Sequence, residues 1–133
     1  MDLLARREHS RLELEQKLSK REYDGDEIRQ TLDKLEQDGL LSNERFTELY
    51  TRMRINKGFG PLKIAAELRA RGVEDGMAHT ALSEYKDAWL ELAKTQQQKK
   101  FHGLPEDFTD RARQMRFLQG RGFSNEQIRQ VLN

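Results

Sequence analysis

The residues of this chain whose type and spacing could do chemistry are its arginines and lysines, and the chemistry they suit is anion binding. The formal net charge is only +1, yet the charges are segregated along the chain. Between residues 52 and 71 six cations accompany one acid, and between residues 111 and 121 four arginines accompany none. Between residues 22 and 48 nine acids accompany three cations. This segregation predicts charged partners of both signs.

No pattern typical of catalysis or metal binding accompanies these charges. The absence of cysteine excludes disulfides, thiolate nucleophiles and cysteine-ligated zinc. His9, His79 and His102 lack further ligands at metal-binding spacing, so we expect a structural or solvated His9 and two surface histidines. Gly58-Phe59-Gly60 lacks the Lys and Ser/Thr of a P-loop. We expect no enzyme activity, no cofactor and no metal, while the helix start at Gly60 suits an anion site and a plain interhelical turn equally.

The elements that must position the charges repeat with a period of fifty residues, and no gap is needed to align them. The coinciding residues are Leu18, Leu68 and Leu118; Arg21, Arg71 and Arg121; Leu32, Leu82 and Leu132; Gly72 and Gly122; and the apolar Tyr23, Val73 and Phe123. Ile28-Arg29-Gln30 also recurs as Ile128-Arg129-Gln130. Self-similarity at such a period indicates tandem helical repeats.

Each unit is predicted to contain a helix, a tight turn and a second helix. The expected helix starts are the capping boxes Ser10 with Glu13, Asp24 with Glu27 and Ser124 with Gln127, the pair Gly60-Pro61, and a cap at Asp110. Gly72 and Gly122 suit the left-handed position that ends a helix. A linking helix from residue 42 should place Phe46, Leu49, Tyr50 and Met53 on one face. A long helix after Asp75 should run through Trp89 toward Lys100 and break at His102-Gly103-Leu104-Pro105.

The expected fold is therefore all-α, an elongated array of three tandem three-helix repeats. The predicted units are residues 1–50, with a short first helix Asp2–His9 and the linking helix from residue 42; residues 51–100; and residues 101–133, which are incomplete. Hydrophobic and charged residues each make up 35% of the chain, which favours an elongated array over one round core. The chain has no apolar run of membrane-spanning length and no signal-peptide pattern, so we expect a cytoplasmic protein. We also expect it to be a monomer.

For two groups of residues, the sequence allows both a structural role and a role in partner contact. Most aromatic residues fall on core stripes, but Phe59 lies in a glycine-flanked turn, where we expect it to be exposed and available for contact. The arginine at positions 21, 71 and 121 suits the free carbonyls of a helix end and a partner contact about equally. A basic two-helix turn also fits a helix-turn-helix DNA reader, although three copies in a row favour an extended solenoid.

The sequence is similar to the RecX family along nearly its whole length. The resemblance lies in Leu4-Ala5-Arg6-Arg7-Glu8-His9-Ser10, Glu13-Leu14, Lys17-Leu18, Arg45-Phe46, Lys57-Gly58-Phe59-Gly60-Pro61, Lys63-Ile64, Glu67-Leu68, Phe117-Leu118 and Arg121-Gly122-Phe123. Two departures are Asn43, where the family usually has an acid, and a lead-in before Leu4 that is shorter than usual.

The resemblance implies a three-repeat fold and a partner, the RecA recombinase. It implies binding in the groove of the RecA–DNA filament, with less ATPase, strand-exchange and co-protease activity, and the DNA phosphate backbone as a secondary partner. On that hypothesis the expected contact residues are Arg6, Arg7, Arg11, Arg52, Arg54, Lys57, Lys63, Arg69, Arg71 and, with less weight, Arg121. The alternatives are a DNA-binding protein that acts without a recombinase, and a helical-repeat adaptor for another protein. No set of residues in the sequence supports a hydrolase.

Overall fold

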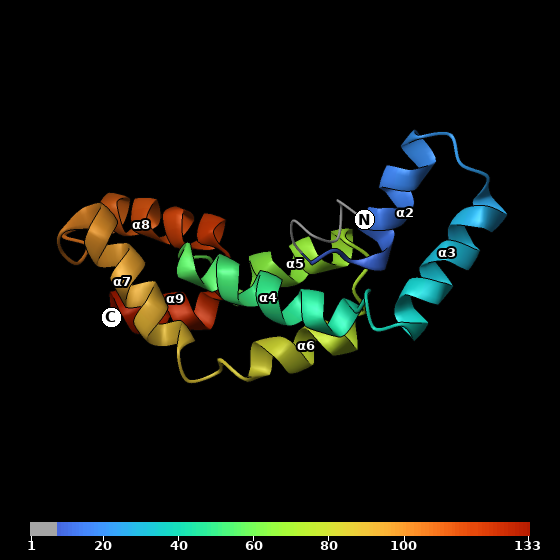
Figure 1. Ribbon diagram of the computed structural model, residues 1–133. Helices are drawn as coiled ribbons and strands as arrows, with labels where there is room; N and C mark the ends of the chain where they lie inside the picture. Colours follow the sequence, from blue (N-terminus) through green and yellow to red (C-terminus); the bar gives the residue numbers. More distant parts are fainter. Residues whose placement is uncertain (1–7) are drawn as a thin grey trace.

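The computed structural model describes residues 8–133, and the secondary structure within that range is entirely helical (Figure 1). The helices are α2 (Arg11–Lys20), α3 (Gly25–Gln37), α4 (Asn43–Asn56), α5 (Pro61–Ala70), α6 (Asp75–Ser83), α7 (Trp89–Phe101), α8 (Phe108–Arg121) and α9 (Asn125–Leu132). The predicted all-α class is confirmed. The predicted helix Asp2–His9 begins outside the described residues, where Arg6 and Arg7 also lie.

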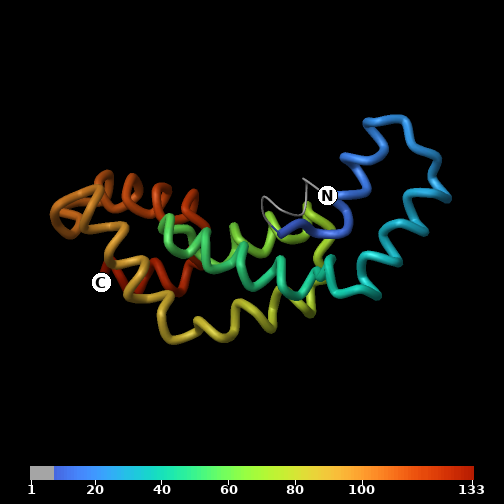
Figure 2. Tube along the Cα trace, viewed as in Figure 1, coloured from blue at the N-terminus to red at the C-terminus, as the bar shows by residue number. Residues whose placement is uncertain are grey.

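The molecule is an elongated array with three separate apolar centres. The α2–α3 hairpin projects at one end, α4–α6 occupy the middle, and α7–α9 form the other end (Figures 1 and 2). Leu14, Ile28 and Leu32 centre the first cluster. Ile64 and Leu68 belong to the second, and the third is formed by Ala93, Leu118, Phe123, Ile128, Val131 and Leu132. We call α2 and α3 the arm and α4 to α9 the body; the unit boundaries at residues 50 and 100 stay a prediction.

Most of the predicted helix ends are confirmed. Ser10 and Ser124 form complete capping boxes with Glu13 and Gln127, and Pro61 is the first residue of α5. Gly72 and Gly122 have φ of +82° and +101°, which is the left-handed conformation that glycine adopts without strain. Ser42 caps α4 by accepting the backbone N–H of Arg45.

One predicted capping box and one predicted cap were wrong. Asp24 stands at the cap position of α3, but its side chain makes no capping hydrogen bond. The cap of α8 is Asp107 instead of Asp110, because the Asp107 carboxylate accepts the Asp110 N–H at 2.8 Å. The cap therefore lies three residues before the predicted one, and the helix starts at Phe108.

The long helix predicted after Asp75 is in fact two helices. The chain turns between Ser83 and Trp89 through three short-range bonds, among them Ala88 N–H to the Tyr85 carbonyl at 2.8 Å. The turn lets Trp89 complete the middle cluster while Ala93, one turn later, joins the terminal one. The sequence gives no Gly or Pro to mark it.

The predicted apolar face of α4 is only partly correct. Phe46 is buried as expected, but Leu49 and Met53 are 43% and 44% exposed. The helix instead buries the small residues Thr47 and Thr51, which allow it to lie close to its neighbours in the body. Leu49 and Met53 consequently remain on the surface beside Arg52.

Candidate binding surface

The ring of Phe59 lies at the centre of a group of cations. The turn after α4 carries this ring, and the Arg54 guanidinium carbon lies 3.9 Å from its centroid. The corresponding distances are 4.8 Å for Arg121 of α8 and 5.5 Å for the Lys63 ammonium of α5. The ring is half-buried against the middle cluster, so the expectation of an exposed, freely available Phe59 was wrong. Its face attracts cations through the aromatic quadrupole.

The same arrangement continues along α8 and the end of α7. The Arg121 guanidinium also lies 5.5 Å from the Phe117 ring, and the Lys100 ammonium lies 5.8 Å from that ring. Phe117 meets Phe101 edge-to-face, with 5.4 Å between centroids. We define the strip as the rings of Phe59, Phe101 and Phe117 with the cations Lys63, Lys100 and Arg121. Contacts between rings and cations connect these residues from Lys63 to Lys100, and Phe101 joins them through Phe117.

The charge of the strip is uncompensated in its middle and neutralised at its ends. At one end Arg54 pairs with Glu67 through two bonds of 2.8 and 2.9 Å. At the other end Arg113, which lies 4.9 Å from the Phe101 ring, pairs with Asp110 and lowers the pKa of that carboxyl. Among the described residues, the strip's own three cations have no acidic partner within ion-pair distance.

A close contact between two turns holds the strip together. The Gly60 N–H donates to the Arg121 carbonyl at 2.8 Å, and the Leu62 N–H donates to the Gly122 carbonyl at 2.9 Å. A Cβ at Gly60 would lie 2.6 Å from the Gly122 oxygen, so only glycine permits this approach. These two N–H groups are engaged by carbonyls, which decides against the anion site considered at Gly60 and in favour of an interhelical turn.

The predicted contact cations fall into two sets. Four are held by acids: Arg11 by Asp33 and Glu36, Arg54 by Glu67, Arg69 by Asp75, and Arg71 by Glu13. Four have no acidic partner in the described part of the chain: Arg52, Lys57, Lys63 and Arg121. The hydrogen bond that Arg11 donates to Glu36 raises the pKa of Arg11.

The three equivalent arginines differ in their roles. Arg71 donates to the Glu67 carbonyl at 3.0 Å and stacks on Tyr50 at 4.7 Å, which is the helix-end role predicted as one option. Arg121 instead stacks on two rings of the strip. Arg21 is exposed at the tip of the arm. The same position in the repeat therefore supports one structural and one surface-forming arginine.

Sequence reasoning missed half of the strip. Lys100, Phe101 and Phe117 were not among the predicted contact residues. A signal was present, because residues 92–105 and 111–125 contain no acid while carrying Lys94, Lys99, Lys100, Arg111, Arg113, Arg116 and Arg121. What the sequence could not supply is the contact of Arg121 with Phe59, since the two are far apart in the chain.

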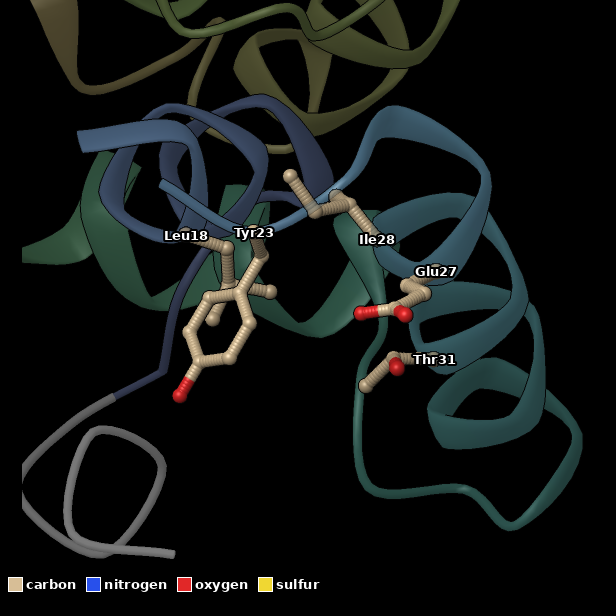
Figure 3. A pocket seen from close by; sticks show the side chains of 5 residues that line it. All are labelled: Leu18, Tyr23, Glu27, Ile28 and Thr31. Carbon is tan, nitrogen blue, oxygen red and sulfur yellow. The ribbon is translucent and has the colours of Figure 1, made fainter. Parts of the chain in front are cut away.

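A second surface feature lies on the arm, where α2 and α3 form a shallow hollow. Leu18 and Tyr23 line one side, and Glu27, Ile28 and Thr31 line the other (Figure 3). Tyr23 is 53% exposed, whereas its repeat equivalents Val73 and Phe123 are 3% and 1% exposed. The neighbouring surface carries acids and bases together, namely Glu15, Asp24 and Asp26 with Arg11 and Arg29.

The histidines and acids of the described residues form no metal-binding cluster. Within residues 8–133 no group of three or more His, Cys, Asp or Glu side chains is placed to hold a metal ion. His9 is fully buried beside Lys17, while His79 and His102 are on the surface, as predicted. None of the helices in the described range is both long enough and apolar enough to cross a membrane.

Comparison with known proteins identifies three family domains in the chain. Residues 1–35 match the model of the first three-helix domain of RecX, residues 42–82 match the second, and residues 87–132 match the third. The regulatory protein RecX of Halorhodospira halophila is 44% identical over 96% of this chain and 80% of its own length. That of Pseudomonas entomophila is 44% identical over 100% of this chain and 86% of its own.

Solved structures agree in fold. The crystal structure of RecX from Lactobacillus salivarius superposes with a TM-score of 0.83 at 24% identity, covering 98% of this chain and 87% of that one. A second crystal structure of a regulatory protein RecX gives 0.86 at 22% identity, covering 98% and 66%. At these identities the likeness shows the three-repeat helical fold.

Proposed function

Since this chain belongs to the RecX family of regulatory proteins, we propose that it regulates the RecA recombinase by binding the RecA–DNA filament as a monomer. On this proposal binding reduces the ATPase, strand-exchange and co-protease activities of the filament. The protein acts in the cytoplasm during DNA repair and recombination. It works through contact and without catalysis of its own.

The observation that carries the proposal is the uneven distribution of charge along the elongated array. The arm and the start of α4 hold the acid-rich segment from residue 22 to 48. The body holds the acid-free, basic segments of α4, α7 and α8. A nucleoprotein filament presents protein surface and phosphate along its length. A slender molecule that is acid-rich at one end and basic over the rest can therefore contact both. Several modest contacts then add to a high affinity, and binding favours one state of the filament.

The contact set is sharpened by the ion pairs. Arg52, Lys57, Lys63 and Arg121 are the stronger candidates, because no acid of the described chain competes for them. Arg11, Arg54, Arg69 and Arg71 would each have to leave a carboxylate. Arg6 and Arg7 stay in the set on the sequence alone.

The decisive experiment is the DNA-dependent ATPase rate of RecA with this protein titrated in. Inhibition at far fewer than one molecule per RecA protomer is the expected result, because each bound molecule affects neighbouring protomers. A matched excess of DNA controls for sequestration of bare DNA. No effect at any ratio, with helicity intact, would refute the proposal and favour the adaptor alternative. Inhibition that disappears in excess DNA would favour a DNA-binding protein acting without the recombinase.

A paired variant locates the contact. Arg52→Glu with Lys57→Glu reverses two exposed cations of α4 and its end, and filament binding should weaken while helicity is unchanged. Lys20→Glu with Lys34→Glu makes the same change in charge on the arm and should have a smaller effect. Equal effects of the two pairs would remove α4 from the contact surface.

A further inference from the structure

We propose that the strip is a binding site for the phosphodiester backbone of a single nucleic-acid strand. The inference deepens the proposed function and rests on it in one respect, that the strand in question is the one carried by the filament. It assigns the nucleic-acid contact to the α7–α8 face of the body. It adds Lys100, Phe101 and Phe117 to the residues involved.

The first argument is that the unpaired cations of the strip are linked to one another through its rings. Arg121 contacts both the Phe59 ring and the Phe117 ring, Lys63 lies beside the first of these rings, and Lys100 lies beside the second. No acid of the described chain pairs with these three cations. A connected group of unpaired cations is complementary to a polyanion, whose phosphates recur at regular intervals.

The second argument is that the cations are held in place before any ligand arrives. Each lies beside a ring, and the Gly60–Arg121 and Leu62–Gly122 hydrogen bonds fix the backbone next to Lys63 and Arg121. A guanidinium that stacks on an aromatic ring packs its face and its aliphatic chain against the protein, and its N–H groups remain free to bind phosphate. Less side-chain entropy is then lost on binding than for a mobile surface lysine.

The third argument concerns the class of partner. An acidic protein surface would also attract these cations, but protein interfaces concentrate exposed apolar anchors, and each ring of the strip lies beside a cation. The segments that carry the strip are rich in cations, and residues 49–66, 92–105 and 111–125 contain no acid. A field of this extent suits a polyanion better than a single carboxylate cluster.

The test is binding of fluorescein-labelled oligothymidylate, followed by fluorescence anisotropy at several salt concentrations. The variant Lys63→Gln, Lys100→Gln, Arg121→Gln removes three charges and keeps most of each aliphatic stem. We expect its affinity to fall by about tenfold or more, and its log–log salt slope to fall by about 2, from roughly 0.7 per single-strand phosphate contact. The control Lys20→Gln, Lys34→Gln, Lys86→Gln removes the same charge from exposed positions off the strip.

A second variant tests the seating of the cations. Phe117→Leu keeps an apolar side chain but removes the face under Lys100 and Arg121, so affinity should fall about two- to fivefold. Phe108→Leu is its control, because Phe108 is 86% exposed and contacts no cation in the described structure. Circular dichroism establishes that each variant is folded.

The outcomes separate the inference from the proposed function. The inference is overturned if the wild-type protein does not bind the oligonucleotide, or if the strip variant and its control bind alike. It is also overturned if the strip variant binds the oligonucleotide normally but no longer inhibits RecA, which would make the strip a protein contact. A third outcome is that the strip variant loses oligonucleotide binding, its control does not, and the wild-type protein leaves the RecA ATPase rate unchanged. The strip would then be supported as a nucleic-acid site, and the proposed function would be refuted.

Discussion

The two junctions of the array are built on different physical principles. Where the middle of the body meets its end, apolar contact is continuous: Trp89 of α7 lies in the middle cluster, and Leu92 packs against both clusters. Two backbone hydrogen bonds and the cations around Phe59 reinforce it. Where the arm meets the body, the contacts are mostly polar, and the arm's own cluster is separate.

The arm junction can be described contact by contact. Glu8 pairs with Arg45, the Arg11 N–H donates to the Asn43 side chain at 2.8 Å, and Glu13 lies 3.7 Å from Arg71. Leu12 supplies an apolar contact by packing against Gly72. Exposed ion pairs contribute little to stability, and salt screens them. The comparison therefore predicts a body that unfolds as one unit and an arm that can change its angle to the body at low cost.

The largest expected effect contrasts two equivalent positions of the repeat. Phe123→Ala should destabilise the protein by about 3 to 5 kcal/mol, because the ring is buried in the terminal cluster. Tyr23→Ala removes the equivalent aromatic side chain from the arm, where it is half exposed, and should cost less than about 1 kcal/mol. Urea unfolding measures both. Similar losses would mean that the arm is packed as tightly as the body.

The next largest effect tests the close contact of Gly122 at the junction between the middle and the end of the body. Gly122→Ala places a Cβ 2.7 Å from the Lys63 backbone nitrogen at a φ of +101°, and should destabilise by about 2 to 3 kcal/mol. Gly120→Ala, two residues earlier in α8, meets no atom within 4 Å and should stabilise by up to about 1 kcal/mol. If Gly122→Ala were as stable as Gly120→Ala, the close approach of the two turns would be disproved.

The sequence predicted the features that depend on nearby residues and missed those that depend on tertiary packing. The repeat register identified the paired helices, the left-handed glycines at 72 and 122, and the capping boxes at Ser10 and Ser124, because these depend on residues only a few positions apart. The turn between Ser83 and Trp89 was missed, since ordinary helix-forming residues occupy it and tertiary packing decides it. The strip was only half identified for the same reason. Equal spacing in the repeat also did not predict the unequal burial of Tyr23 and Phe123.

A smaller effect should come from the ion pair at the arm. The hydrogen bond that Arg45 donates to Glu8 raises the pKa of Arg45, so the guanidinium remains charged at neutral pH. Arg45→Gln removes the pair, and amide hydrogen exchange in α2 and α3 should become faster while exchange in α5 and α9 stays unchanged. Arg29→Gln, which removes the pair with Asp26 within the arm itself, serves as the control. Faster exchange throughout the body would show that the two parts unfold together.

The smallest effect is the response of the wild-type protein to salt. Raising the salt concentration from 0.1 to 1 M shortens the screening length from about 10 Å to about 3 Å. The ion pairs of the arm junction should weaken, whereas the apolar contacts of Trp89 and Leu92 do not depend on screening. Spin labels at Lys20 on the arm and Gln130 on α9, each introduced as a cysteine into this cysteine-free chain, should therefore give a broader distance distribution at high salt. Labels at Glu48 and Gln130, both within the body, should give the same distribution at either concentration, and broadening of that pair as well would show that the two junctions are alike.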